Sequence, residues 1–242
     1  MKRISLLALL NVALVSPSMA QNQNITMSEV GRLTGGSYTP FEYKRLVDQT
    51  KLTPEQAYYT PDWKAGTLLF TNEQALAVPA MRFNMAMRLV EVQDPTAEGG
   101  IRIIPAASIR GFILGPAGKN GQAFEVQSYR SASYSGKNFF ESLNQGPVRL
   151  FLLHEVVERP AARNEALGVE TRAAQYLRST QPYVLRAGQE RVEPLSLTKK
   201  AVLRMFNEKA PQIEAYASQN NLSYEQLPNV VKMMEHYQSL IK

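Results

Sequence analysis

The chain has 242 residues, a formal net charge of +6 and no cysteine. Its basic residues are spread along the sequence, whereas a nucleic-acid-binding protein needs a clustered basic face, so this class is disfavoured. Without cysteine the protein can form no disulfide and its mature N-terminus can carry no lipid-modified cysteine. Burial of apolar residues must therefore stabilise the fold.

Residues 1–20 have the pattern of a secretory signal peptide. Basic Met1-Lys2-Arg3 precedes a twelve-residue apolar stretch, Ile4 to Val15, and Ser18-Met19-Ala20 supplies small residues, so we expect cleavage after Ala20. The apolar stretch is shorter than the ~20 residues that span a bilayer, and no later stretch approaches that length, so no transmembrane helix is expected. The exported chain, periplasmic or extracellular, keeps 25 basic residues against 21 acidic ones and a charge of +4.

Residues 21–60 are polar and poorly patterned, which predicts an N-terminal linker or extension with room for one short helix. Tyr58, Tyr59 and Trp63 stand just before the first expected strand. A ligand platform is one interpretation of these rings. Because aromatic side chains mostly serve cores, we expect them to pack on the end of a sheet.

Residues 61–195 are predicted to form a β-rich domain, because short apolar runs recur about every ten residues. Pro79 should end a strand or mark an edge, since it cannot donate to a sheet. The run Met81–Gln93 changes parity near Arg88, which predicts a bulge or tight turn there. Val148–Val157 is nearly continuous apolar sequence, typical of a central strand buried on both faces.

Further strands are expected along the rest of this region. Gly115–Gly121 reads as a surface loop, and residues 159–168 read as a loop or short helix. Val169–Arg178 and Pro182–Arg186 are predicted as two separate strands, followed by a short last strand near Arg191–Leu195.

From Ser196 the apolar residues adopt helical spacing, so residues 196–242 are predicted to be a C-terminal helical segment. Ser196 is the expected cap of its first helix, and Pro211 fits the first turn of a second. Ser223-Tyr-Glu-Gln226 is a capping box, which places the start of the last helix there. The apolar stripe from Leu227 to Ile241 needs a partner surface. That surface is the β-domain or the preceding helices by default, and another protein in the alternative interpretation.

Parts of this pattern resemble uncharacterised exported β-rich proteins of the Bacteroidetes. In the β-region the matching residues are Gly66-Thr-Leu-Leu-Phe70, Val78, Phe83-Asn84, Leu89-Val-Glu-Val92 and Arg110-Gly-Phe-Ile113. In the helical tail they are Leu195-Ser-Leu-Thr-Lys-Lys200, Met205-Phe206, Ile213, Tyr216 and Glu235-His-Tyr237. The resemblance implies export and this architecture, and it carries no catalytic motif.

The segment His154-Glu155-Val-Val-Glu158 is similar to the helical His-Glu-x-x-His motif of zinc proteases. It lacks the second histidine and lies in a β-like run, whose alternate side chains face opposite ways, so no metal site is expected. A pair of carboxylates can serve a glycosidase. The sequence does not identify catalytic residues, and the candidates that it offers are Glu155, Glu158 and His154.

Three other motif-like segments are set aside. Gly115-Pro-Ala-Gly-Lys-Asn120 lacks the first glycine and the final Ser or Thr of a phosphate loop. Ser133 and Ser135 lack the frame of a nucleophile elbow, and with only two histidines in the chain a serine triad is disfavoured. Met85 and Met87 alternate along a strand, so we expect them in the core and not in a soft-metal site. No cofactor is predicted.

The expected fold class is α+β, with a mostly antiparallel, sandwich- or barrel-like β-domain followed by the helical segment. The leading functional hypothesis is a non-enzymatic binding or interaction module with an envelope protein or polymer as partner. The alternatives are a hydrolase acting on envelope or nutrient polymers and a carrier of an apolar ligand. Two converging carboxylates would favour the hydrolase and an apolar cavity the carrier, whereas a filled core with an open sheet edge would favour interaction. The oligomeric state is not predicted.

Overall fold

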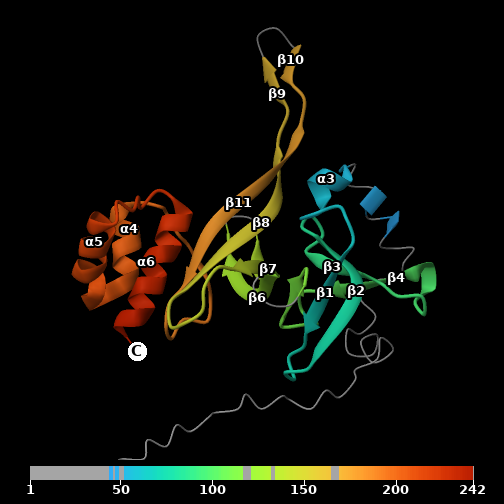
Figure 1. Ribbon diagram of the computed structural model, residues 1–242. Helices are drawn as coiled ribbons and strands as arrows, with labels where there is room; N and C mark the ends of the chain where they lie inside the picture. The colour runs from blue at the N-terminus through green and yellow to red at the C-terminus, as the bar shows by residue number, and fades with distance from the viewer. Residues whose placement is uncertain are drawn as a thin grey trace, which may run out of the picture.

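The computed structural model describes residues 44–45, 47–48, 52–116, 121–131, 134–164 and 169–241. Within these residues a mostly antiparallel β-domain is followed by a helical tail, which confirms the predicted α+β class (Figure 1). The predicted signal peptide, residues 1–20, and the predicted linker up to residue 43 lie outside the described residues.

The elements of the first half are α3 (Pro54–Ala57), β1 (Lys64–Leu69), β2 (Ala75–Asn84), β3 (Leu89–Gln93), the short 3-10 helix η1 (Glu98–Gly100), β4 (Ile101–Pro105), β5 (Gly111–Leu114), β6 (Gln122–Arg130) and β7 (Ser135–Ser142). Those of the second half are β8 (Arg149–Arg159), β9 (Ala162–Asn164), β10 (Val169–Arg172), β11 (Gln175–Leu185), β12 (Glu193–Pro194), α4 (Lys199–Leu203), the 3-10 helix η2 (Arg204–Lys209), α5 (Ala210–Gln219) and α6 (Leu227–Leu240).

Ten strands form one antiparallel sheet in the order β12-β11-β8-β7-β6-β5-β1-β2-β3-β4. The chain runs outward through β2, β3 and β4 and then returns, so that β5 pairs with the free side of β1. β8 and β11 pair over eleven consecutive positions, from Arg149–Leu185 to Arg159–Gln175. β7 and β8 are joined over only three positions, from Phe140–Leu153 to Ser142–Phe151.

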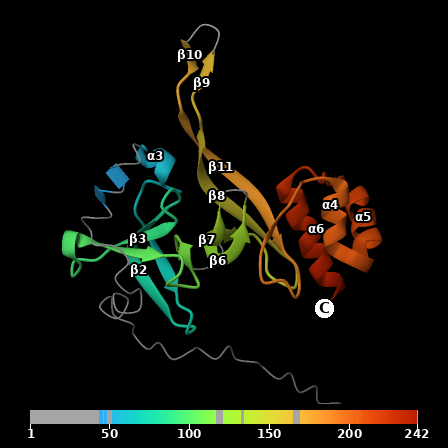
Figure 2. The same cartoon turned by 180° about the vertical axis from the view of Figure 1, so that it is seen from behind.

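The β8–β11 ribbon leaves the body of the protein at its far end. Figures 1 and 2 show it rising between the helical tail and the β1–β4 half of the sheet, and the small β9–β10 ribbon forms its tip. We call the part from the Glu155–Ser179 pair to this tip the arm. The predicted burial of Val148–Val157 on both faces is therefore correct only for the first half of β8. Its last residues are exposed because they lie on the arm.

Two of the four prolines that lie within strands, Pro79 and Pro182, stand where the sequence predicted a strand boundary. The predicted strand end or edge at Pro79 is wrong, because β2 runs on to Asn84 between β1 and β3. Pro79 lies where the register with β1 shifts, between Val78 and Met81, and its missing N–H is tolerated at this bulge. The predicted break before Pro182 is wrong, since β11 runs from Gln175 to Leu185. The Pro182 carbonyl accepts from Leu195 N on the outer side of β11, so its ring nitrogen also faces away from β8 and no ladder bond is lost.

The parity change near Arg88 is a tight turn, as predicted. β2 ends at Asn84 and β3 begins at Leu89, and Arg88 has the left-handed φ of 56° that such turns use. The Asn84 side chain accepts from the Met87 backbone N at 3.0 Å and so closes the turn. Met85 is buried in the core, in agreement with the expected packing role.

The described residues form four apolar cores, of which the smallest contains only Leu89 and Ile103 as buried residues. In the first, Phe83, Phe112, Phe124 and Phe139 meet from four strands, with the Phe112 and Phe124 rings stacked at 4.6 Å. The second lies between the helical tail and the sheet, which contributes Leu150 and Val184 from its strands and Val148 and Leu195 from the residues that flank them. The third, which includes Tyr129, Phe140, Phe151, Leu153 and Tyr183, covers the β7–β8 junction. The tail therefore packs on the sheet, which was the default expectation.

A buried ion pair anchors the N-terminal aromatic residues to the sheet. The fully buried Glu91 accepts from Arg82 Nε at 2.8 Å and from Tyr58 Oη at 2.6 Å. The Arg82 guanidinium lies 4.0 Å from the centre of the Tyr58 ring and 4.3 Å from that of Trp63, so the two rings enclose the cation. These aromatic residues serve packing, as the sequence predicted.

The caps of the tail differ from the expected ones. Thr198, and not Ser196, accepts from Ala201 N at 3.3 Å and begins α4. The last helix begins at Leu227, because residues 223–226 form a turn in which the Ser223 hydroxyl accepts from Glu225 N. Pro228 then occupies the first helical turn, where its missing N–H costs nothing.

Candidate functional site

The three residues that the sequence offered as candidates all lie on β8, but they do not converge. Successive side chains of a strand alternate between its faces, so His154 and Glu158 share one face and Glu155 lies on the other. Glu158 is exposed opposite Tyr176 and forms no hydrogen bond or ion pair through its side chain with another described residue. Glu155 and Glu158 therefore cannot flank one glycosidic bond as the two carboxylates of a glycosidase do.

His154 is buried at the centre of a polar cluster. Its Nε2 lies 2.7 Å from Glu141 Oε2 and its Nδ1 lies 3.1 Å from Thr180 Oγ1, so both ring nitrogens are satisfied. The Tyr59 ring meets the imidazole edge-on at 4.8 Å. Burial, and then the nearby Glu141 carboxylate, raises the pKa of the Tyr59 hydroxyl.

The arrangement of Glu141, His154 and Thr180 combines a carboxylate, an imidazole and a hydroxyl, which are the groups of a nucleophilic triad. Thr180 is, however, the direct cross-strand partner of His154. Such a pair is an ordinary means of stabilising a sheet. Because cross-strand pairing accounts for this contact, we assign the cluster a structural role.

Glu155 lies on the opposite face of β8, where its surroundings disfavour the charged carboxylate. Burial raises the pKa of its carboxyl group, although the positive charge of Arg88 opposes the rise. Arg88 comes from the β2–β3 turn, and its guanidinium lies 3.9 Å from the centre of the Tyr134 ring. No ion pair of Glu155 is formed among the described residues.

The feature that the sequence did not reveal is the apolar surface of the arm. Four large apolar residues are exposed in the described part of the chain, and three of them, Val157 (37% exposed), Leu177 (43%) and Val169 (52%), lie on the arm. Val157 and Leu177 are direct cross-strand partners and form one continuous patch. The fourth, Ile241, is at the end of α6. Exposed apolar groups gathered on one projecting element mark an interaction surface.

The outer edge of β11 adds backbone groups to this surface. Residues with even numbers turn their backbone away from β8, as the Pro182–Leu195 and Tyr176–Gln56 hydrogen bonds show. Between these two capped positions, the N–H and C=O groups of Arg178 and Thr180 have no backbone partner among the described residues. This short segment is a sheet edge without backbone pairing, and the Arg178 side chain donates to Glu55 O and Tyr59 O beside it.

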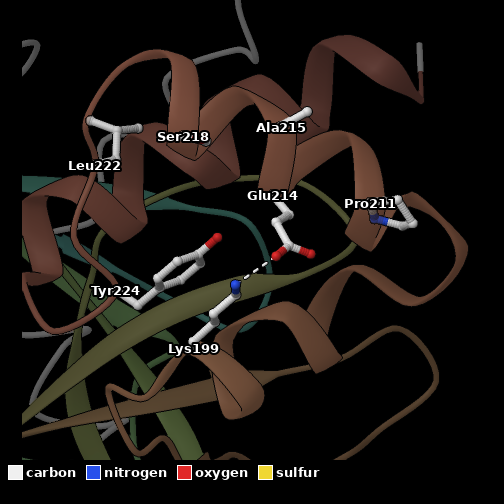
Figure 3. A pocket seen from close by; sticks show the side chains of 7 residues that line it. All are labelled: Lys199, Pro211, Glu214, Ala215, Ser218, Leu222 and Tyr224. Atoms are coloured by element: carbon white, nitrogen blue, oxygen red, sulfur yellow. Dashed lines mark ion pairs between the residues drawn. The ribbon is translucent and has the colours of Figure 1, made fainter.

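A shallow pocket of about 530 Å³ lies in the helical tail, between α4, α5 and the loop before α6 (Figure 3). Lys199 and Glu214 form an ion pair of 2.6 Å across it, and the Tyr224 hydroxyl points toward them. The bond from Glu214 raises the pKa of the Lys199 ammonium group, and burial, followed by the charge of Glu214, raises that of Tyr224. The charges of this pocket therefore neutralise each other.

No protein-family model matches the chain, and no match was found among curated proteins or solved structures. The described residues contain no group of three or more His, Cys, Asp or Glu side chains placed to hold a metal ion. None of the helices described is both long and apolar enough to cross a membrane.

Proposed function

We propose that this protein is an exported binding module that docks a partner of the cell envelope through its arm. The observation that carries the proposal is the position of the exposed apolar residues. Three of the four described ones are on a single ribbon that projects from the body, two of them as a cross-strand pair. Burying such a pair in an interface would remove apolar area from water and drive association.

The filled interior supports binding at the surface over the carriage of an apolar ligand. Phe83, Phe112, Phe124 and Phe139 are each fully buried and in ring-to-ring contact, so the described strands enclose a packed core. A carrier would need an apolar cavity in that place. The divergence of Glu155 and Glu158 removes the main support for a glycosidase.

Export is part of the proposal and rests on the sequence. The signal-peptide pattern of residues 1–20 supports it, as does the resemblance to exported proteins of the Bacteroidetes. A periplasmic or extracellular location would expose the arm to envelope proteins and polymers.

The proposal is tested by adding charge to the arm. The Val157→Lys/Leu177→Lys double variant and the Ile241→Lys variant are compared with the wild type for sedimentation with isolated envelopes of the source bacterium. Ile241 is the matched control because it is equally apolar and is 39% exposed outside the arm. We expect the arm variant to lose at least tenfold in envelope binding and the control to bind as the wild type does. Equal binding of the two variants, or no saturable wild-type binding, would contradict the proposal.

A further inference from the structure

One face of the arm carries an ordered row of side chains. On β8 the row reads Glu155, Val157, Arg159, and their cross-strand partners on β11 are Ser179, Leu177 and Gln175. An exposed apolar pair therefore lies between a carboxylate on the body side and a guanidinium on the tip side. All three β8 side chains point to the same face because they alternate with Val156 and Glu158.

The two charges of the row are not neutralised by a bonded partner, although the positive charge of Arg88 acts on Glu155. Neither Glu155 nor Arg159 forms an ion pair or a side-chain hydrogen bond with another described residue. The two cannot pair with each other, since four residues of a strand separate their Cα atoms by about 13 Å. Burial raises the pKa of the Glu155 carboxyl group, and the positive charge of Arg88 opposes this rise.

We propose that the occupant of this face is a second copy of the same chain, with the two arms packed face to face and their β8 strands antiparallel. This inference rests on the proposed function of the arm as a docking element. Because both partners use the Val157–Leu177 pair, self-association and envelope binding exclude each other. A two-fold axis through the Val157–Leu177 pair places Val157 against Val157 of the partner subunit and Leu177 against Leu177 of the partner subunit. The same rotation places Glu155 opposite Arg159 of the partner subunit, and it does so twice.

Charge complementarity is what selects a second copy. The order acidic, apolar, basic becomes basic, apolar, acidic in the rotated copy. Each charge of the row therefore meets one of opposite sign. A two-fold contact requires a patch that complements itself in this way. The apolar pair at the centre is enclosed by the two ion pairs, which is the usual arrangement of an apolar interface core and a charged rim.

The size of the patch sets the strength of the complex. Five residues along each of two strands cover an area on the order of 200–400 Å² per copy, below the ~800 Å² per partner of a standard stable interface. The dimer is accordingly weak and depends on concentration. It forms where the protein is confined and dissociates on dilution.

The experiment uses the full chain without its predicted signal peptide in sedimentation equilibrium from micromolar to millimolar concentration. For the wild type we expect the weight-average mass to rise from one chain toward two. Glu155→Arg alone and Arg159→Glu alone each create like charges across the two-fold axis, and we expect each to weaken self-association at least tenfold. The Glu155→Arg/Arg159→Glu double variant exchanges the signs and should return to within about threefold of the wild-type dissociation constant, if the two pairs are equivalent.

A mixture of the two single variants gives the sharpest result. One variant then presents two cations and the other two carboxylates, so we expect a heterodimer although neither associates with itself. Circular dichroism and the urea midpoint of each variant verify that it is folded. A monomeric wild type up to millimolar concentration, or single variants that associate as the wild type does, would overturn the second copy as occupant.

The envelope-binding assay separates this inference from the function on which it rests. If the wild type stays monomeric while Val157→Lys/Leu177→Lys loses envelope binding, the arm docks a different partner and only the dimer is wrong. If the wild type stays monomeric and the arm variant binds envelopes normally, both proposals are wrong.

Discussion

The buried pair of Arg82 and Glu91 allows the most quantitative prediction. Arg82→Ala leaves the Glu91 carboxylate, which has no exposed area, without the guanidinium that lies 2.7 Å away. Removing one partner of a buried pair costs about 3–5 kcal/mol, because the remaining charge stays desolvated. The loss of the cation between Tyr58 and Trp63 adds to this cost. Since domains are stable by only about 5–15 kcal/mol, we expect a large part of the stability to be lost.

Two further variants isolate the cause. Arg82→Met combined with Glu91→Leu removes both charges, and its free energy of unfolding should lie within about 2 kcal/mol of the wild type, since apolar replacements of buried pairs are well tolerated. Arg186→Ala is the surface control, because its partner Glu193 is half exposed, and exposed pairs contribute about 0–1 kcal/mol.

Urea denaturation followed by circular dichroism measures these differences as shifts of the midpoint at constant slope. The reasoning would be refuted if Arg82→Ala cost no more than Arg186→Ala. It would equally fail if the double variant were as unstable as the single one, since the cost would then not come from the remaining charge.

Three other variants test separate features by the same method. Gly111→Ala should cost more than about 2 kcal/mol, because a Cβ there would lie 2.2 Å from the Phe124 carbonyl oxygen; a neutral effect would contradict the close strand approach. Glu155→Gln should be more stable than the dilute wild type at pH 7. Burial raises the pKa of the wild-type carboxyl in the folded state, so wild-type stability falls as the pH rises from the unfolded pKa of about 4.3 through the folded one. If the free energy of unfolding of the wild type rose relative to that of Glu155→Gln between pH 4 and 8, the predicted pH dependence would be wrong. Thr198→Ala should cost about 1 kcal/mol and Ser196→Ala much less, and the reverse order would restore the cap expected from the sequence.

Much of the fold could be predicted from local pattern. The apolar runs of β1–β3, the turn at Arg88 and the change to helical spacing after Leu195 each follow from residues close in sequence. The sequence did not show that Pro182 lies inside β11. A proline is tolerated there only because its nitrogen faces the outer edge, and that depends on which neighbour the strand finds.

The candidate site was less predictable. His154 was noticed for a zinc-protease motif, yet its partners Glu141 and Thr180 are 13 and 26 residues away and meet it only through strand pairing. The apolar run ending at Val157 indicated a buried strand, yet Val157 is exposed. Apolar composition alone does not distinguish a core residue from an exposed one. The continuation of β8 beyond the body is a property of the tertiary structure.

The three-position junction of β7 and β8 has a consequence for the dynamics of the sheet. On one side of it, β1–β7 share the phenylalanine core, and on the other, β8 and β11 share a core with the helices. Side chains still bridge this seam, through the third core and the Glu141–His154 and Glu125–Arg149 pairs. Once these contacts break, the molecule should open there before either half loses its own ladder, as a sub-global unfolding event. Amide hydrogen exchange would then divide the continuous sheet into two cooperative units, and slow exchange in β8 and β11 would follow the helical tail and not the strands beside them.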